Sequence, residues 1–413
     1  MGIASAIEST RRTSMTSTDT SKSAAPSCPV LNFDYTELKP AGTWFEKWAE
    51  TGQEYPYFLN QFGQGFWTVA NYQGALEVLQ DPHTFSSSAI YVQDPNPVYK
   101  WIPEMLDGDE HRRWRQLLAP HFSPSAVQRM AERIRERARG LVESLAERGS
   151  CDFMADFAQL YPTSIFLELI GLPVEELPQF MEWEHAALHG GQSDDNDAMI
   201  SAMMMVAERF NALIAERRAE PRDDLFSKAI GFEIDGRPVT DEELCSFGLL
   251  MFLAGLDTVS VTLGWAFRHL AMNPDDRDRL VSDPGLIPNA IEEFMRAYAI
   301  VIPGRKVAVD TEFHGCPMKA GDMVSVPLAA AMRDPEAFPD ASTIDITRTR
   351  NNHIAFGAGP HRCLGSHLAR LELKIALEEW HRLIPDYAIP ADANLLETGL
   401  TIGLETLPLE WNR

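Results

Sequence analysis

The segment that most constrains the fold runs from Thr240 to Pro274 and has the pattern of one long helix. Thr240 and Glu243, three residues apart, form a capping-box motif, and no proline follows before Pro274. A helix of about 32 residues is about 48 Å long. Its middle, residues 247–264, is apolar on nearly every face, which is typical of a helix surrounded by protein. We therefore expect it to lie at the centre of a domain.

Helical periodicity also dominates the rest of the chain. Apolar residues recur at intervals of three and four in six further segments: Gly42–Gly52, Gln73–Leu79, Asp109–Ala119, Ser125–Glu147, Met154–Ile170 and Met199–Arg217. Strand-like segments are short, and they are Gly65–Val69, Val307–Val309 and Met323–Pro327. The sequence thus predicts a mainly α protein with a small β region.

We expect one domain over residues 35–413, preceded by a disordered tail over residues 1–34. The start of the chain is rich in Ser and Thr, and the Arg11-Arg12 pair is followed by no apolar segment of a signal peptide. A division into two domains at the acidic stretch Gly190–Asp197 is less favoured, because the central helix follows it closely. The longest strongly apolar run, Phe247–Gly255, is about half of the ~20 residues that span a bilayer, so we expect no membrane span.

Charge and cysteine usage exclude several classes of protein. Sixty acidic against 36 basic residues give a net charge of -24, which repels nucleic acids and anionic lipid surfaces. The five cysteines, Cys28, Cys151, Cys245, Cys316 and Cys363, stand singly without CxxC spacing. This argues against a disulfide framework or a structural zinc site and favours a reducing, cytoplasmic location.

The most informative motif reads FGAGPHRCLG and covers residues 356–365, directly before a helical pattern from Ser366 to Leu383. Glycines permit close backbone approach to a flat ligand, and free amides at a helix N-terminus stabilise a thiolate. The segment resembles the haem-binding loop of cytochromes P450 at every position of that motif. The resemblance implies that Cys363 is the axial thiolate ligand of haem b.

The central helix contains a second motif, AGLDT, at residues 254–258. An acid beside an alcohol inside an apolar helix is costly unless it is paired or functional. The motif resembles the oxygen-activation motif of the same family, which implies a local loosening of the helix and a proton relay through Asp257 and Thr258.

Further positions match the family's supporting residues. Glu293 and Arg296 lie on one helix face and, with Arg348 of the later loop, resemble a buried Glu-Arg set that supports the cysteine loop. The resemblance also implies four residues that bind the haem carboxylates: His111, Arg115, Arg305 and His361.

The resemblance covers the chain from about residue 35 to its end and is closest to soluble bacterial P450s of the camphor-hydroxylating type. It implies a haem held between the long central helix and the Cys-loop helix, and a monooxygenase that inserts one atom of O2 into its substrate. A peroxide-driven peroxygenase and a non-catalytic haem-binding protein are the alternatives; the Asp257-Thr258 pair argues against both.

The chain has no room for its own electron-transfer domain, so we expect a ferredoxin-type donor with its reductase. It would dock on a cluster of arginines: Arg112, Arg113, Arg129, Arg133, Arg135, Arg137, Arg139 and Arg362.

We expect a compact apolar substrate. A terpenoid is favoured, and a fatty acid or an alkyl-aromatic is the alternative. The candidate pocket residues are Tyr99, Trp101, Leu253, Ala254, Val301 and Ile402.

Overall fold

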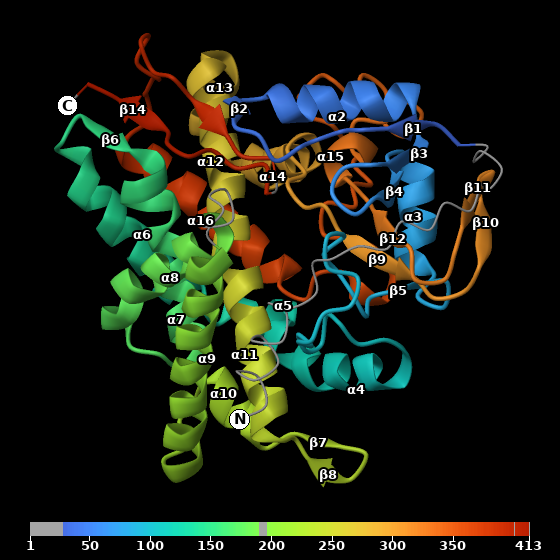
Figure 1. Ribbon diagram of the computed structural model, residues 1–413. Coiled ribbons are helices and arrows are strands. Elements are labelled where there is room, and N and C mark those ends of the chain that lie inside the picture. Colours follow the sequence, from blue (N-terminus) through green and yellow to red (C-terminus); the bar gives the residue numbers. More distant parts are fainter. Residues whose placement is uncertain (1–27, 190–195, 400, 413) are drawn as a thin grey trace.

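The computed structural model describes residues 28–189, 196–399 and 401–412, and it is mostly helical, with a sheet at one side (Figure 1). Six strands form the larger sheet in the order β1 (Val30–Leu31), β3 (Tyr57–Asn60), β4 (Phe66–Val69), β12 (Met323–Ser325), β9 (Gly304–Val307) and β5 (Phe85–Ser86). The β1–β3 and β4–β12 pairs are parallel, and the other pairs are antiparallel. The expected fold class is confirmed.

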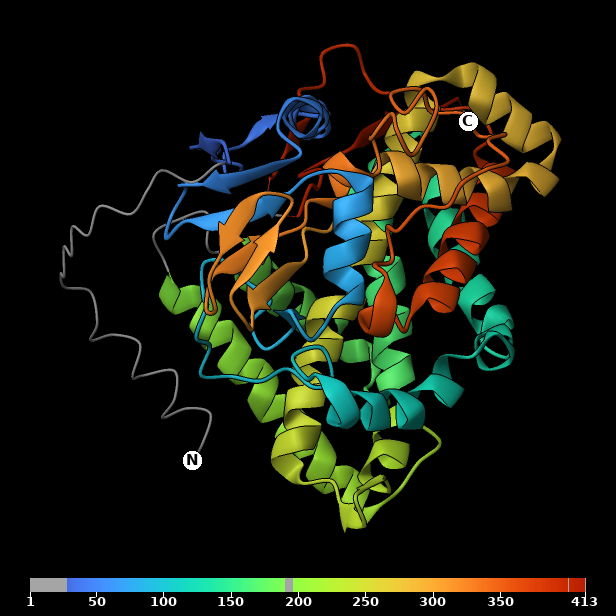
Figure 2. The ribbon, with the colours of Figure 1, turned by 90° about the vertical axis from the view of Figure 1, so that its right-hand side faces the viewer.

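The predicted central helix runs through the middle of the molecule (Figures 1 and 2). It consists of α11 (Asp241–Gly255) and α12 (Asp257–Met272), and Thr240 and Glu243 form the expected capping box. The expectation of one unbroken helix is wrong at Leu256, where the helix is interrupted. Directly before the break, a Cβ on Gly255 would lie 2.8 Å from the ring of Phe166, so glycine is needed for α7 (Leu160–Ile170) to pack there.

Ten further helices lie around this axis: α4 (Gly108–Leu118), α5 (Pro124–Gln128), α6 (Ala131–Ala146), α7 (Leu160–Ile170), α8 (Leu177–His189), α9 (Asn196–Ala219), α10 (Leu225–Ile230), α13 (Pro274–Ser282), α14 (Ile287–Ala297) and α16 (Ser366–Leu383). Helices α2 (Thr43–Glu54), α3 (Tyr72–Gln80) and α15 (Leu328–Ala331) lie on the side of the sheet (Figure 1). Helix α16 packs against α5, α6 and α14, and α9 packs against α8 and α11.

Short helical turns and two-stranded sheets complete the fold. The turns are η2 (Ala119–Phe122), η3 (Met154–Ala158), η4 (Val174–Glu176), η6 (Pro284–Leu286) and η7 (Gly359–His361). The small sheets are β2 (Lys39–Pro40) with β13 (Leu396–Glu397), β6 (Ser150–Asp152) with β14 (Pro408–Glu410), β7 (Glu233–Ile234) with β8 (Arg237–Pro238), and β10 (Thr311–Phe313) with β11 (Cys316–Met318).

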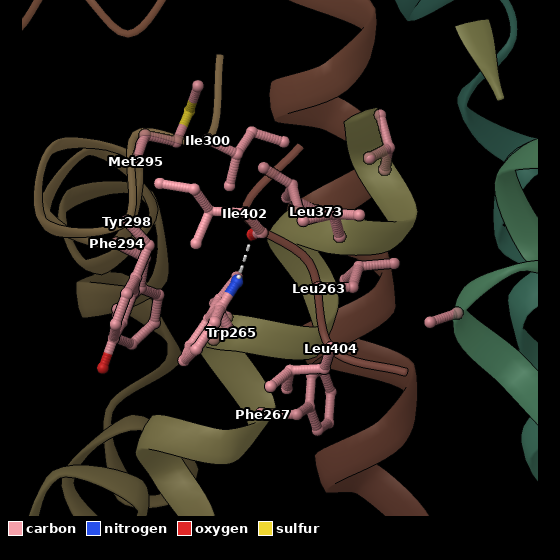
Figure 3. Close-up of a cluster of buried hydrophobic side chains, with 14 of the residues drawn as sticks. Leu263, Trp265, Phe267, Phe294, Met295, Tyr298, Ile300, Leu373, Ile402 and Leu404 are labelled. Carbon is pink, nitrogen blue, oxygen red and sulfur yellow. Dashed lines mark hydrogen bonds between the residues drawn. The ribbon is translucent and has the colours of Figure 1, made fainter. Parts of the chain in front are cut away.

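Helix α12 is buried within the main core. Its Trp265 donates a hydrogen bond from Nε1 to the carbonyl of Ile402 over 2.7 Å, and its ring stacks on Tyr298 after α14 (Figure 3). The combined α11–α12 segment is long and apolar enough to cross a membrane, but 61% of its most apolar 18-residue stretch is buried inside the protein. Helix α9 is also long and apolar enough to cross a membrane, and 33% of its most apolar 18-residue stretch is buried. The α11–α12 segment therefore has the character of a core helix, as the sequence predicts.

Three predicted boundaries differ from the structure. The segment predicted as one helix over Ser125–Glu147 is divided into α5 and α6, and Ser123 caps the first of them by accepting a hydrogen bond from the amide of Ala126. The predicted Met154–Ile170 helix begins as the π-helical turn η3. The predicted Val307–Val309 strand instead ends at Val307.

Two expectations about the start of the chain and the cysteines also need correction. Within the predicted tail, residues 1–27 lie outside the described residues, but β1 pairs with β3. Cys28 and Cys316 form a disulfide, with Cα atoms 5.3 Å apart. Because two of the five singly placed cysteines form a disulfide, the absence of CxxC spacing does not support the expected reducing compartment. Residues 190–195 of the acidic stretch Gly190–Asp197 lie outside the described residues.

Candidate functional site

The Cys363 loop is closed by its own backbone and placed at the start of α16. The amide of Cys363 donates a hydrogen bond to the carbonyl of Phe356 over 2.8 Å. Gly359 has a φ of 68°, and a Cβ at this position would collide with the carbonyl of Leu79 at the end of α3. Glycine is therefore required for the loop to pass over α3. The Cys363 side chain is exposed.

Opposing effects act on the Cys363 thiol. Desolvation by the protein atoms around it raises its pKa, while the Gly365 amide and the charges of Arg115 and Arg362 lower it, and the net direction is upward. A bound iron ion would supply the positive charge that converts such a thiol to a thiolate. The surroundings thus fit a metal-bound cysteine better than a free, reactive thiolate.

Three of the residues expected to bind haem carboxylates lie close together. The rings of His111 and His361 stack with centroids 3.9 Å apart, and Arg305 and His361 both approach the carboxylate of Glu104, at 4.0 and 3.7 Å. Both ring nitrogens of the buried His361 lack a hydrogen-bond partner among the described residues. Buried donors without partners beside an arginine fit a group that carries two carboxylates. Arg115, the fourth residue, donates to the carbonyl of Arg362 over 2.6 Å.

Two acids in this cluster were missed by sequence reasoning. Glu104 lies between Arg305 and His361, and Asp107, at the N-terminus of α4, lies 3.6 Å from the other nitrogen of His361. Burial opposes the charge of His361, but these two carboxylates raise its pKa on balance. Burial, His361 and Arg115 lower the pKa of His111 to about 4, which keeps it neutral. The spacing of Asp107 and His111, four residues apart, is the sequence signal that could have identified Asp107.

The structure places Asp257 and Thr258 directly after the break in the central helix. Asp257 is the first residue of α12, and burial raises its pKa to about 6. The hydroxyl of Thr258 donates to the carbonyl of Ala254 over 3.1 Å. An acid with a pKa near neutrality beside an alcohol can accept and release protons at physiological pH.

The predicted Glu-Arg set forms one buried network. Glu293 and Arg296 are fully buried and joined by two hydrogen bonds of 2.9 and 2.7 Å, and Arg348 binds Glu293 over 3.0 Å. Arg296 also donates to the carbonyls of Met332, Ala341 and Thr343. The network therefore fixes α14 to the loops that precede the cysteine.

A neighbouring network was not predicted. Arg370 of α16 binds both oxygens of Glu292 over 2.6 and 2.7 Å, and His353 lies 2.9 Å from the same carboxylate. The Arg370 guanidinium lies 4.4 Å from the ring centre of Phe356, the first residue of the cysteine motif. This network joins the motif to α14 and α16.

Three of the six expected pocket residues lie around one apolar cluster, and Ile402 lies in another. Tyr99 stacks on Trp101 with ring centroids 4.8 Å apart, and both belong with Leu253 to the cluster around α11. Burial and the charge of Asp94 raise the pKa of Tyr99, so its hydroxyl stays protonated. Ile402 instead has no exposed surface and packs in the core around Trp265 (Figure 3). Ala254 and Val301 are exposed.

Comparison with known proteins gives consistent matches. A family model described as Cytochrome P450 matches residues 191–283 and 285–380. Probable cytochrome P450 127A1 of Sinorhizobium fredii is 36% identical over 352 residues, which are 84% of each chain. Methyl-branched lipid omega-hydroxylase of Mycobacterium bovis is 32% identical over 85% of each chain. The crystal structure of CYP101J2 matches with a TM-score of 0.85 and 32% identity, covering 94% of this chain and 98% of that one.

Proposed function

This chain belongs to the cytochrome P450 family and is a haem-thiolate monooxygenase, and from this premise we propose that it hydroxylates a small, branched apolar substrate with electrons from a ferredoxin. The observation that carries the proposal is the position of Cys363, in a closed glycine loop at the start of α16, which also contains the buried His361, whose ring nitrogens form no hydrogen bond with a described residue. Haem, when bound through the thiolate, supplies the redox chemistry that activates O2.

The residues around the cysteine have distinct roles in this proposal. Arg305 and His361 hold the haem carboxylates, and Arg115 both contributes charge and fixes the loop through the carbonyl of Arg362. The neutral His111 supports the ring of His361 by stacking.

Proton supply is assigned to Asp257 and Thr258. The hydroxyl of Thr258 donates to the carbonyl of Ala254, so its lone pairs remain available to accept a hydrogen bond from Asp257. In the proposed relay an O–H bond forms on Thr258 as the hydroxyl releases its own proton. The break at Leu256 allows this part of the helix to depart from regular hydrogen bonding. These features support a proton relay and disfavour a peroxide-driven reaction, which needs no such delivery.

The substrate proposal rests on the apolar character of the candidate pocket. Tyr99, Trp101 and Leu253 present aromatic and aliphatic surface with one hydroxyl, which suits a compact apolar molecule that carries a single polar group. The name of the Mycobacterium bovis relative refers to a methyl-branched lipid. Terpenoids share that branching, so we favour a terpenoid over a straight-chain fatty acid or an alkyl-aromatic.

The proposed docking surface for the ferredoxin is smaller than the sequence predicts. Arg112, Arg113, Arg133, Arg135 and Arg139 each bind a carboxylate of this chain. Arg129, Arg137 and Arg362 form no ion pair with any described residue. Helices α5 and α6 pack against α16, whose N-terminus follows the Cys363 loop. These three arginines are therefore the proposed contacts for an acidic partner.

The experiment that tests the substrate proposal is a titration of the ferric protein with limonene, dodecanoate and ethylbenzene. A fitting apolar ligand displaces water from the iron and shifts its spin state, which the Soret absorption reports. We expect limonene to give the largest shift at saturation. A larger shift with dodecanoate or ethylbenzene would reassign the substrate class.

A further inference from the structure

Lys306 of β9 has no role in the proposed function, but its side chain binds the segment that connects β5 to α4. We call this segment, residues 87–107, the pocket loop, because it carries two of the candidate pocket residues. The ammonium of Lys306 donates hydrogen bonds to the carbonyl of Pro95 over 2.7 Å and to Oδ1 of Asn96 over 2.8 Å. Lys306 forms no ion pair with any described residue, so its charge is satisfied by neutral oxygen atoms of the pocket loop.

Strand β9 presents one side to the pocket loop and the other to the cofactor cluster. Side chains at alternate positions of a strand face the same side of a sheet, so Gly304 and Lys306 share a side and Arg305 faces the other. A Cβ on Gly304 would collide with the carbonyl of Ile90, which shows that the pocket loop packs directly on the strand there. Arg305 belongs to the cluster that is expected to bind the haem carboxylates.

A short, stiff segment connects the lysine contact to the aromatic pocket residues. Within residues 95–99, Asn96 stands between two prolines, and Tyr99 follows three residues later. Each proline fixes its own φ and restricts the residue before it, so the position of Asn96 constrains that of Tyr99. Tyr99 in turn stacks on Trp101 with ring centroids 4.8 Å apart. The contact with Lys306 therefore bears on both aromatic side chains.

The pocket loop is attached to other elements on either side of this segment. Gln64, between β3 and β4, forms hydrogen bonds of 3.1 and 3.2 Å with Gln93, and Ser246 of α11 donates to the carbonyl of Lys100. Among the hydrogen bonds of the described chain, those from Lys306 alone connect residues 94–99 to another element. Loss of this lysine should thus release one segment of the pocket loop and leave its two flanking attachments in place.

We propose that Lys306 positions the Tyr99–Trp101 wall of the substrate pocket by holding residues 94–99 on β9. This inference rests on the proposed function, in which the two aromatic residues form that wall. With the segment held, the wall is ordered before a substrate arrives, so binding does not have to supply the free energy that orders it. Lys306 acts through the pocket loop and is a positioning residue rather than a catalytic one.

The attachment of the pocket loop is tested by hydrogen exchange of the purified holoprotein, followed by mass spectrometry. The amide of Asp94 donates to the carbonyl of Tyr91 over 2.9 Å and reports opening of the segment. In Lys306→Met we expect this amide to exchange about tenfold faster, because charge-assisted hydrogen bonds no longer hold the segment closed.

Two further variants separate the hydrogen bonds from the charge of the lysine. Asn96→Ala removes one acceptor from an exposed position and leaves Lys306 in place, so it should accelerate exchange by a smaller factor. The matched control is Lys319→Met, which removes an equal charge from an exposed lysine that binds Asp310 over 2.9 Å. Lys319→Met should leave the exchange of the pocket loop unchanged.

The positioning role is tested by titration of ferric Lys306→Met with limonene, dodecanoate and ethylbenzene. Because the lysine orders a wall of the pocket, the dissociation constant should rise about tenfold for every one of these compounds that binds the natural protein. KM should rise more than kcat falls, and the Soret band under carbon monoxide should keep its position, since the Cys363 loop is untouched. Lys306→Arg, which keeps the charge and its donors, should recover most of the affinity.

The outcomes of the two measurements are distinct. Unchanged exchange in both Lys306→Met and Asn96→Ala would show that the lysine does not hold the pocket loop. Faster exchange with unchanged dissociation constants would overturn the positioning role. Weaker binding of dodecanoate alone would instead identify a direct contact of the lysine with a ligand carboxylate. If the natural protein shows no thiolate-type spectrum or binds no compound of the panel, the proposed function fails, and hydrogen exchange still decides whether Lys306 holds the pocket loop.

Discussion

Arg115 donates a hydrogen bond from Nη2 to the backbone carbonyl of Arg362 over 2.6 Å, one residue before Cys363. The contact joins α4 to the cysteine loop, so one guanidinium both fixes the loop and contributes positive charge beside the proposed haem carboxylates. The acidic chain as a whole repels such carboxylates, which makes this local charge important for retention of the cofactor.

Arg115→Ala should weaken haem binding. A hydrogen bond to a charged group contributes about 1.5–3 kcal/mol, which corresponds to about a tenfold to 100-fold loss of affinity. The rate of haem transfer to apomyoglobin in excess measures this loss. The control is Arg112→Ala on the same helix, where the exposed side chain binds Asp109. Equal haem loss from the two variants would contradict the role of Arg115.

The Glu292–Arg370 network predicts a specific pH dependence of stability. Burial disfavours the Glu292 carboxylate, but hydrogen bonds from Arg370 and His353 outweigh this and lower its pKa to about 2. Because the folded-state pKa is depressed, the stabilisation is present above about pH 4.5 and is lost as the pH falls toward 2.

Arg370→Gln should therefore lower the free energy of unfolding by about 2 kcal/mol at pH 7, with a smaller difference from the natural protein at pH 3.5. Urea denaturation at the two pH values measures both differences. Lys374→Gln, on the same helix with a half-exposed side chain, should have little effect at either pH. A difference between Arg370→Gln and the natural protein that grows on acidification would have the wrong sign.

The unpaired arginines predict salt-dependent electron transfer. Arg137→Glu should lower the second-order rate of reduction by a bacterial [2Fe–2S] ferredoxin about tenfold at low ionic strength, and high salt should remove most of the difference. Stopped-flow reduction under carbon monoxide measures the rate. Arg222→Glu, exposed and next to α10, is the control. If Arg222→Glu slows reduction as much, the effect reflects net charge rather than a docking surface.

The Cys28–Cys316 disulfide predicts three reactive thiols in the denatured, unreduced protein, from Cys151, Cys245 and Cys363. Titration with a thiol reagent in guanidinium counts them, and a count of five would show that the pair is reduced. Cys28→Ser should also lower stability by about 2–4 kcal/mol, since the disulfide restricts the unfolded chain. Cys151→Ser should cost less.

The residues of the site that could be predicted from the sequence are those whose partners are fixed by local spacing. The capping box at Thr240, the i,i+3 pair Glu293–Arg296 and the approach of Cys363 to a helix N-terminus follow from helix geometry alone. The match to a known family added Arg348, whose contact with Glu293 spans 55 positions.

What could not be predicted depends on tertiary contacts between distant segments. Glu104 shows its role only beside Arg305. The pairing of Cys28 with Cys316 spans 288 positions. Ile402 reads as one more apolar residue of a turn, but its carbonyl is bound by Trp265 in the core.

The most direct test of the central claim is the absorption spectrum of the reduced protein under carbon monoxide, compared between the natural chain and Cys363→Ser. We predict a red-shifted, thiolate-type Soret band in the natural protein that is absent from Cys363→Ser, while Cys245→Ser keeps the band. A histidine-type band in the natural protein, or the same thiolate band in Cys363→Ser, would contradict the assignment of Cys363 as the iron ligand.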